Sequence, residues 1–259
     1  MPHVAVFDSG LGGLTVLEAI RRTLPGVAIT YVADNAAFPY GPKPEAEVRA
    51  RVVSVIGALL AVETPDAVVI ACNTASTAAL GALRETFPGM PFVGTVPALK
   101  PAAEVTRTGV IGLLATPGTV HRPYIDDLAA RVAAGCRIVR VGAPRLATLA
   151  EGMLRGIAPP PGAVAAEIAP LFNDPLLDVV VLGCTHYPLL RQALQEAAPR
   201  PVHWLDSADA VARQTVRLCG TAAGAVVQTS NRCLLTKGAA DMAAPLVLVG
   251  LDRPVLLAV

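Results

Sequence analysis

Short, unbroken apolar runs alternate along the chain with longer segments of helical pattern. An apolar run bounded by turn residues is typical of a strand that is buried on both faces, as in a parallel sheet. The runs predict strands at residues 4–8, 29–33, 66–71, 92–94, 109–114, 137–141, 178–182 and 202–205. The intervening segments predict helices at residues 14–24, 45–62, 74–87, 98–107, 145–151 and 163–172. A further helix is expected to begin at residue 189. The last helix is expected to be capped by residues 206–209 and to end at residue 218. This alternation indicates the α/β class.

Two of the predicted strands lead directly into a cysteine, two polar residues and the start of a helix. These corner sequences are Cys72-Asn73-Thr74 and Cys184-Thr185-His186. Open α/β folds bind ligands at the carboxyl edge of the sheet, and a helix N-terminus lowers the pKa of a cysteine. We therefore expect both thiols to lie at a ligand-binding edge and to have lowered pKa values.

The order of elements in the first half of the chain recurs in the second half at an offset of roughly 110 residues. Each half begins with a strand, a turn and a helix, and later presents a strand, a cysteine and a helix. The repeat predicts two pseudo-symmetric α/β lobes with mostly parallel sheets flanked by helices, and an active site in the cleft between them. We expect residues 1–97 plus 207–259 to form the N-terminal lobe and residues 98–206 the C-terminal lobe.

The first strand leads into a glycine-rich turn, Asp8-Ser9-Gly10-Leu11-Gly12-Gly13. The turn does not match the G-x-G-x-x-G dinucleotide fingerprint, because Thr15 stands where the third glycine belongs. Backbone N–H groups in such a turn can hold an anion, with Asp8 and Ser9 at its edge. The alternative is that Asp8 merely caps the following helix. A proline- and glycine-rich segment, residues 34–44, predicts a surface loop that either shapes a pocket or connects two elements rigidly.

The composition narrows the class of protein. Of the 259 residues, 53% are hydrophobic and 16% are charged, which suits a compact globular chain. The formal net charge is +1 and no basic stripe is present, so nucleic acid is not an expected partner. No apolar run reaches the length of a membrane span, and no signal sequence precedes the first strand, so neither a membrane nor export is expected. The odd set of cysteines, Cys72, Cys136, Cys184, Cys219 and Cys233, is expected to be reduced, as in a cytoplasmic protein.

Several kinds of site use cysteines. A lone buried cysteine is usually part of the core, and this interpretation suits Cys136, Cys219 and Cys233. A metal site needs further His or Cys ligands at ligand spacing, and a hydrolase needs only one nucleophile. A redox pair requires the two sulfurs to approach each other, whereas matched positions on opposite walls of a cleft leave room for a ligand between them.

Two proton-carrying groups on opposite faces of one carbon suit stereoinversion. Loss of an α-proton gives a planar carbanion, and inversion then requires a proton from the other face. One thiolate acts as the base and the other, neutral thiol acts as the acid, and the roles exchange in the reverse direction. Asp8 beside one thiol and His186 beside the other are candidate proton-handling groups.

Four motifs together resemble glutamate racemases, of the cofactor-independent aspartate/glutamate racemase superfamily. They are residues 6–13 (VFDSGLGG), 34–41 (DNAAFPYG), 71–76 (ACNTAS) and 183–189 (GCTHYPL). The resemblance extends from residue 4 to about residue 211. It implies two α/β lobes with the active site between them, and the interconversion of L- and D-glutamate, which supplies D-glutamate for peptidoglycan.

The resemblance also implies roles for individual residues and partners. It implies that Cys72 deprotonates D-glutamate and that Cys184 deprotonates L-glutamate. The substrate-holding residues that it implies are Asp8, Ser9, Tyr40, Gly41, Asn73, Thr74, Thr116, Thr119, Thr185 and His186. The lysines are Lys43, Lys100 and Lys237, none of them in the motifs, so we expect no pyridoxal cofactor, and no metal either. A homodimer is also implied. Some members have an N-terminal extension linked to activation by a cell-wall precursor, and we expect this chain to lack that control.

Two alternatives remain. Aspartate or hydantoin racemases of the same superfamily share the cysteine corners, so the corners alone do not define the substrate. A non-catalytic binder of amino acids or of a protein partner is the other alternative, because some relatives inhibit DNA gyrase. The repeated cysteine argues against pure binding, and the balanced charge gives no support for DNA mimicry.

Overall fold

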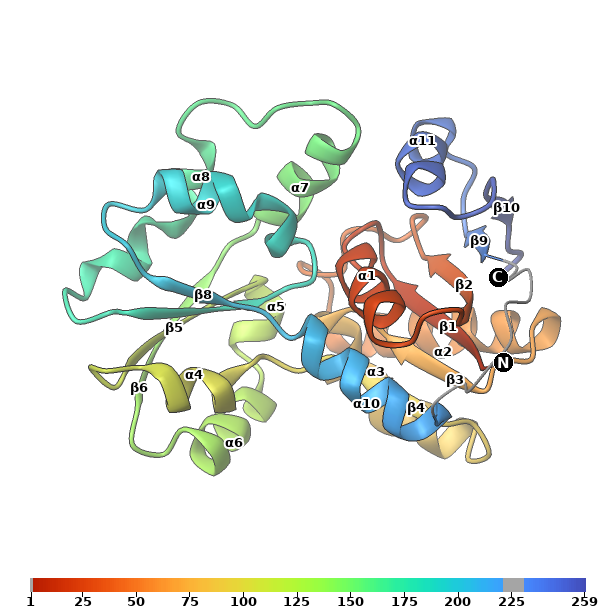
Figure 1. Cartoon of the computed structure of the whole chain (residues 1–259), viewed down its shortest axis with the longest axis horizontal. Coiled ribbons are helices and arrows are strands. Elements are labelled where there is room, and N and C mark those ends of the chain that lie inside the picture. Colours follow the sequence, from red (N-terminus) through yellow and green to blue (C-terminus); the bar gives the residue numbers. More distant parts are fainter. Residues whose placement is uncertain (1, 221–230) are drawn as a thin grey trace.

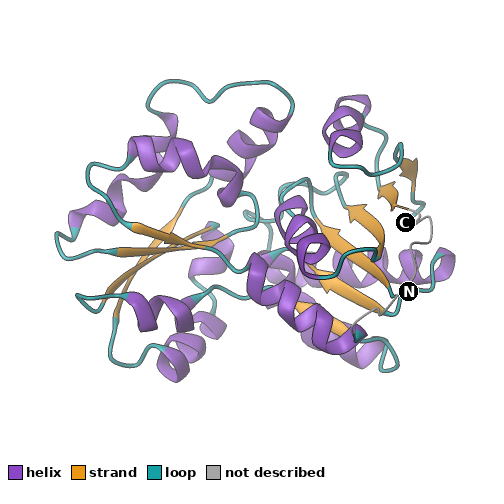
Figure 2. Ribbon diagram, in the orientation of Figure 1, coloured by secondary structure: helices purple, strands orange, loops and turns teal. Residues whose placement is uncertain are grey.

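The structure, a computed structural model, describes residues 2–220 and 231–259. It contains two sheets side by side, each flanked by helices (Figures 1 and 2). The strands are β1 (His3–Asp8), β2 (Ala28–Ala33), β3 (Ala67–Ile70), β4 (Phe92–Gly94), β5 (Val110–Ala115), β6 (Arg137–Gly142), β7 (Val179–Gly183), β8 (His203–Leu205), β9 (Asn231–Leu235) and β10 (Val255–Leu256).

The helices cover both faces of each sheet (Figure 2). They are α1 (Leu14–Thr23), α2 (Glu45–Val62), α3 (Asn73–Thr86), α4 (Leu99–Val105), α5 (Pro117–Val120), α6 (Pro123–Val132), α7 (Leu146–Leu154), α8 (Ala163–Ile168), α9 (Arg191–Ala197), α10 (Ala208–Cys219) and α11 (Ala240–Leu248). Short 3-10 helices lie at Ala169–Asn173 and Tyr187–Leu190. Among the described residues, no helix combines the length and the apolar character that crossing a membrane requires.

The predicted α/β fold with parallel sheets is confirmed. The larger sheet has the strand order β10-β9-β2-β1-β3-β4 and the smaller one β6-β5-β7-β8, and every described strand pair is parallel. Four neighbouring strands of the larger sheet, β2-β1-β3-β4, have the same order as the whole smaller sheet, which is the relationship that the offset repeat predicts. We call the larger sheet with its helices lobe 1 and the smaller sheet with its helices lobe 2.

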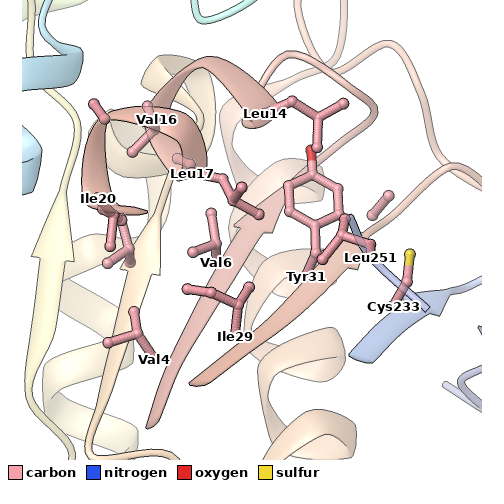
Figure 3. Close-up of a cluster of buried hydrophobic side chains, with 14 of the residues drawn as sticks. Val4, Val6, Leu14, Val16, Leu17, Ile20, Ile29, Tyr31, Cys233 and Leu251 are labelled. Atoms are coloured by element: carbon pink, nitrogen blue, oxygen red, sulfur yellow. The ribbon is translucent and has the colours of Figure 1, made fainter. Parts of the chain in front are cut away.

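Alternate residues of the central strands face opposite helix layers. In β1, Val4 and Val6 pack towards α1 (Figure 3), which lies beside α10. Ala5 and Phe7 point to the other face and pack towards α2 and α3. A strand covered on both faces has no solvent side, and this explains its unbroken apolar sequence. Full burial of each large apolar side chain stabilises the fold by about 1.5–3 kcal/mol.

Lobe 2 repeats this arrangement around β7. Val180 and Leu182 face the layer that contains α7, α8 and α9, and Val179 and Val181 face α4 and α6. The equivalent packing of β1 and β7 fixes the strand ends of each lobe firmly. Rigid strand ends position the loops that follow them.

The C-terminal segment adds two strands to lobe 1, because β9 pairs with β2 and β10 pairs with β9. Helix α11 follows β9 and lies opposite α7 of lobe 2 at the top of the view in Figure 1. The lobe boundaries at residues 97 and 207 remain a prediction. Residues 221–230, which the prediction assigns to the first lobe, lie outside the described residues.

Candidate active site

A narrow cavity lies where the loops after β1 and β3 of lobe 1 meet those after β5 and β7 of lobe 2. Cys72 and Cys184 both line it, and both are nearly buried, with exposed fractions of 6% and 8%. The predicted site residues that line this cavity are Ser9, Tyr40, Gly41, Cys72, Thr74, Thr116, Cys184 and His186. One cavity therefore receives one cysteine from each of the two repeated corners.

The other predicted site residues lie behind this wall. Asn73 and Thr185 line a small neighbouring cavity that also touches Cys184. Thr119 is buried behind Thr74, with 3.2 Å between their hydroxyl oxygens. Asp8 is fully buried beneath Ser9 and accepts the Ser9 backbone N–H at 2.6 Å.

Cys72 lies at the N-cap of α3, as the sequence predicts, but its pKa does not fall. Burial of the thiol and the neighbouring Asp8 carboxylate raise the pKa of Cys72 well above its ordinary value. The expectation of a lowered pKa is wrong for Cys72 because desolvation and a like charge outweigh the partial charge of the helix N-terminus. The raised pKa therefore favours the neutral thiol form of Cys72.

Cys184 lies in a different local structure. The chain after β7 forms the 3-10 helix Tyr187–Leu190 before α9 begins, so Cys184 is not at the N-terminus of an α-helix. Instead, the Nδ1 atom of His186 lies 3.9 Å from the Cys184 sulfur. An imidazolium at this distance stabilises a thiolate by charge.

His186 is held by Glu151, a buried residue of α7 that is not among the predicted site residues. The Nε2 atom of His186 lies 2.9 Å from Oε1 of Glu151. Burial lowers the pKa of His186, but its hydrogen bonds to Cys184 and Glu151 outweigh burial, so the pKa lies well above the ordinary value. Burial raises the pKa of Glu151, but the bond to His186 and other contacts leave it below the ordinary value. These two shifts favour the imidazolium and carboxylate forms of the pair.

The glycine-rich turn of lobe 1 packs directly against this pair. The Leu11 backbone N–H donates a hydrogen bond to Glu151, so the anion in the predicted backbone cradle is a carboxylate of the protein itself. A Cβ atom on Gly10 would lie 2.1 Å from Glu151 Oε1, and one on Gly12 would lie 2.3 Å from His186 Nδ1. The two glycines allow the lobes to approach this closely.

Asp8 contacts both lobes behind the cavity wall. It accepts the backbone N–H of Gly13 just before α1, and it accepts the Thr185 hydroxyl of lobe 2 at 3.3 Å. Burial raises the pKa of Asp8, and this effect exceeds the opposing charge of His186. Asp8 binds the backbone at the start of α1 and also contacts lobe 2 behind the cavity, so capping does not exclude the predicted role in the site.

Three hydroxyl groups meet at one side of the cavity, two of them from residues that line it and one from a residue behind it. The oxygens of Thr74, Thr116 and Thr119 lie 3.0–3.2 Å from one another, and Thr74 comes from lobe 1 whereas the other two come from lobe 2. Next to them, the Gly118 backbone N–H donates to the Gly41 carbonyl at 3.2 Å. Hydroxyl groups reorient freely, so this cluster can turn its hydrogens towards an anionic ligand.

Tyr40 lines the cavity, but its hydroxyl points elsewhere and donates to Asp34 Oδ2 at 2.6 Å. Asp34 also accepts two hydrogen bonds from Arg51 and one from Thr236. Burial and the Asp34 charge raise the pKa of Tyr40, so the hydroxyl stays protonated. Asp34 and Arg51 therefore fix the loop that carries Tyr40 and Gly41, a supporting role that no local sequence pattern predicts.

Asn73 offers polar atoms that the described protein leaves unused. Its side chain is buried, and neither the amide oxygen nor the amide nitrogen has a hydrogen-bond partner in the described part of the chain. A buried amide without partners is costly unless a ligand satisfies it. Asn73 is therefore well suited to bind a polar ligand.

Comparison with known proteins agrees with this architecture. The family model for Asp/Glu/Hydantoin racemases matches residues 11–215, and the chain belongs to this family. Glutamate racemase from Brucella anthropi is 50% identical over 218 residues, which cover 83% of this chain and 78% of that protein. Glutamate racemase from Mesorhizobium japonicum is 48% identical over 244 residues, which cover 93% of each protein.

Solved structures give the same result. The crystal structure of Escherichia coli glutamate racemase, in complex with L-glutamate and the activator UDP-MurNAc-Ala, superposes with a TM-score of 0.92 at 41% identity, covering 99% of this chain and 98% of that one. The racemase from Thermus thermophilus gives a TM-score of 0.77 at 30% identity, covering 100% and 97%. The fold of this chain is therefore the racemase fold.

Proposed function

We propose that the protein is a glutamate racemase, which interconverts L- and D-glutamate at the α-carbon and supplies D-glutamate for peptidoglycan. The observation that carries this proposal is the single cavity lined by Cys72 and Cys184, one from each repeated corner. The high identity to relatives named glutamate racemase supports glutamate over aspartate or a hydantoin as the substrate.

In the direction from L- to D-glutamate, the Cys184 thiolate takes the α-proton. The electron pair of the broken C–H bond stays on the α-carbon as a planar carbanion, and the neutral Cys72 thiol donates its proton to the opposite face. The His186 imidazolium, 3.9 Å from Cys184, supports the starting thiolate. The neutral thiol form, which the raised pKa of Cys72 favours, suits this direction.

In the reverse direction, Cys72 has to be the thiolate and Cys184 the thiol. We assign the substrate ammonium group to Asp8, whose carboxylate is one of the causes of the raised pKa of Cys72. An ammonium ion paired with Asp8 offsets that charge, so substrate binding itself makes the Cys72 thiol easier to deprotonate.

We assign the substrate carboxylates to neutral donors and to backbone N–H groups. The strongest candidates are buried polar groups. They are the amide of Asn73, which has no hydrogen-bond partner among the described residues, and the hydroxyl cluster of Thr74, Thr116 and Thr119. Ser9, Gly41, Thr185 and His186 complete the proposed contacts, and Tyr40 contributes through its backbone. Preorganised donors of this kind stabilise the charge that develops on the carboxylate next to the carbanion.

Circular dichroism of the amino acid tests the proposal directly. The purified protein is incubated with L-glutamate and, separately, with L-aspartate, after chelator treatment and without pyridoxal phosphate. We expect the optical signal of glutamate alone to decay to zero. A persistent glutamate signal, or decay of aspartate instead, contradicts the proposed substrate, and decay only after pyridoxal phosphate or a metal is added contradicts the proposed cofactor-free reaction.

We further propose a cytoplasmic homodimer, on the basis of the family resemblance. Light scattering of the purified protein across micromolar concentrations measures its mass in solution. A monomeric mass throughout contradicts the dimer.

A further inference from the structure

Arg155 contacts two carboxylates that belong to different lobes. It lies at the C-terminal end of α7 in lobe 2. Its Nη2 atom lies 3.1 Å from Oε2 of Glu151 on the same helix, and its Nη1 atom lies 2.9 Å from Oδ2 of Asp241. Asp241 belongs to the first turn of α11 in lobe 1, which faces α7 across the top of the view (Figure 1). One guanidinium group therefore bridges the two lobes.

Hydrogen bonds connect Arg155, through Glu151 and His186, to one of the two sulfurs. Glu151 gives one carboxylate oxygen to Arg155 and the other to His186, which in turn lies beside Cys184. A carboxylate bonded through both oxygens has a fixed plane, whereas a glutamate bonded through one oxygen can rotate about its terminal bond. Cys72 has no hydrogen bond to Glu151 or His186 among the described residues, and the charges of these two residues reach it only through its neighbour Asp8.

Arg155 lies on the solvent side of Glu151. Together with Glu151, Asp241 and Lys237, it lines an outer pocket of about 400 Å³, which shares only Phe38 with the cavity of the two cysteines. Its side chain is 30% exposed, whereas that of Glu151 is 4% exposed. Arg155 therefore acts on the site through Glu151 and not by touching the ligand.

We propose that Arg155 is a positioning residue that holds Glu151 against His186. In this role it supports proton transfer at Cys184 but not at Cys72. The ion pair with Asp241 supports this role by keeping the lobes together. The inference rests on the proposed two-thiol function. It assigns a role in one half-reaction to a residue that lies outside the cavity.

Racemisation is the first test. Arg155→Met keeps the apolar stem and removes both ion pairs, and Arg155→Lys keeps the charge. Arg140→Met is the matched control, because the Arg140–Asp126 pair is equally exposed, with fractions of 29% and 65% against 30% and 57% for Arg155 and Asp241. We expect Arg155→Met to lower kcat about tenfold with KM within about twofold, as for the loss of one charge-assisted hydrogen bond. Arg155→Lys recovers part of the rate, and Arg140→Met matches the wild type. An unchanged kcat in Arg155→Met overturns the inference.

Hydrogen exchange at the α-carbon of glutamate, in deuterium oxide, measures proton transfer on each face of that carbon separately. In a Cys72→Ala background, the Cys184 thiolate removes the α-proton of L-glutamate, its S–H exchanges with solvent, and a deuteron returns to the same face without inversion. A Cys184→Ala background reports on Cys72 and D-glutamate in the same way. We expect Arg155→Met to slow exchange about tenfold in the first background and less than about twofold in the second. Asp241→Asn is expected to slow the first exchange in the same direction by a smaller factor.

The outcomes distinguish the inference from the proposed function. Equal slowing in both backgrounds indicates a general structural role for Arg155 and overturns the inference alone. An unchanged first exchange in Asp241→Asn overturns the bridging role of that contact. If neither single-cysteine protein exchanges with Arg155 intact, the thiol assignment of the proposed function fails, and the inference fails with it. Each variant is first checked for an unchanged thermal unfolding transition.

Discussion

The imidazole of His186 lies 3.9 Å from the sulfur of Cys184, whereas the group beside Cys72 is the buried carboxyl of Asp8. The two sulfurs occupy equivalent positions in the repeated fold but have neighbours of opposite charge. An imidazolium favours a thiolate, and a carboxylate disfavours it. The predictions below follow from this asymmetry and from the close contact of the lobes.

Replacing either cysteine abolishes racemisation. Cys72→Ala removes one proton carrier and Cys184→Ala removes the other, and we expect each to lower kcat by at least about a thousandfold, within the range of general acid–base catalysis. Circular dichroism of L- and D-glutamate measures both directions. Cys136→Ala, in lobe 2 but remote from the cavity, is the control and should retain wild-type turnover. Near-normal turnover in either cavity variant excludes the two-thiol assignment.

Adding one methyl group to the glycine-rich turn separates the lobes. In Gly12→Ala, the new Cβ would lie 2.3 Å from His186 Nδ1, so the ring has to leave its present position beside Cys184 and Glu151. We expect at least a tenfold loss of kcat and a loss of about 1–3 kcal/mol in the free energy of unfolding. Urea denaturation measures the free energy.

Gly81→Ala is the control for that substitution. Gly81 lies within α3, and a Cβ there meets nothing within 4 Å. We expect a gain of up to about 1 kcal/mol from the helix propensity of alanine, with unchanged turnover. Wild-type activity in Gly12→Ala would show that His186 tolerates displacement.

Tyr40 supports the loop with its hydroxyl and is not expected to use it on the substrate. Tyr40→Phe removes the 2.6 Å hydrogen bond to Asp34, so we expect a loss of about 1.5–3 kcal/mol in stability and a kcat within about twofold of wild type. Tyr124→Phe, on α6 of lobe 2, should change neither quantity. A large loss of kcat without a loss of stability would instead assign the Tyr40 hydroxyl to catalysis.

His186 makes stability depend on pH. Folding raises its pKa well above the ordinary 6.5, so the native state holds this proton more tightly than the unfolded state. The stabilisation is complete below pH 6.5 and decreases as the pH rises towards the folded-state pKa, by about 1.4 kcal/mol per pH unit.

Urea unfolding at pH 6 and pH 8 tests this dependence when wild-type His186 and His186→Asn are compared in a Cys184→Ala background, in which no thiol lies beside the ring. We expect the protein with His186 to lose more stability than the variant between these two values. The same replacement at the exposed His121 should behave like the protein with His186. Parallel curves for the proteins with His186 and His186→Asn would mean that His186 is neutral in the folded protein.

The strands and the cysteine corners were predictable because each is encoded within a few consecutive residues. A doubly covered strand requires an apolar run, and both Cys72 and Cys184 directly follow such a run. The internal repeat then made their convergence on one cavity predictable.

Contacts between distant segments were not predictable in the same way. Glu151 meets Leu11 across 140 positions of sequence, and no local pattern marks it as different from any other acidic residue of a helix. The pKa of Cys72 was predicted in the wrong direction, because the sequence shows the helix start but not the extent of burial. The orientation of the Tyr40 hydroxyl likewise depends on Asp34 and Arg51, which the fold brings together.

The shared strand order of the two sheets has a consequence for the handedness of the reaction. A repeat relates two halves by rotation, and no rotation converts a chain of L-amino acids into its reflection. The two walls of the cavity therefore present non-superposable surroundings to a pair of mirror-image substrates. Because enantiomers have equal free energies, kcat/KM has to be the same in both directions, yet kcat and KM are each free to differ between them.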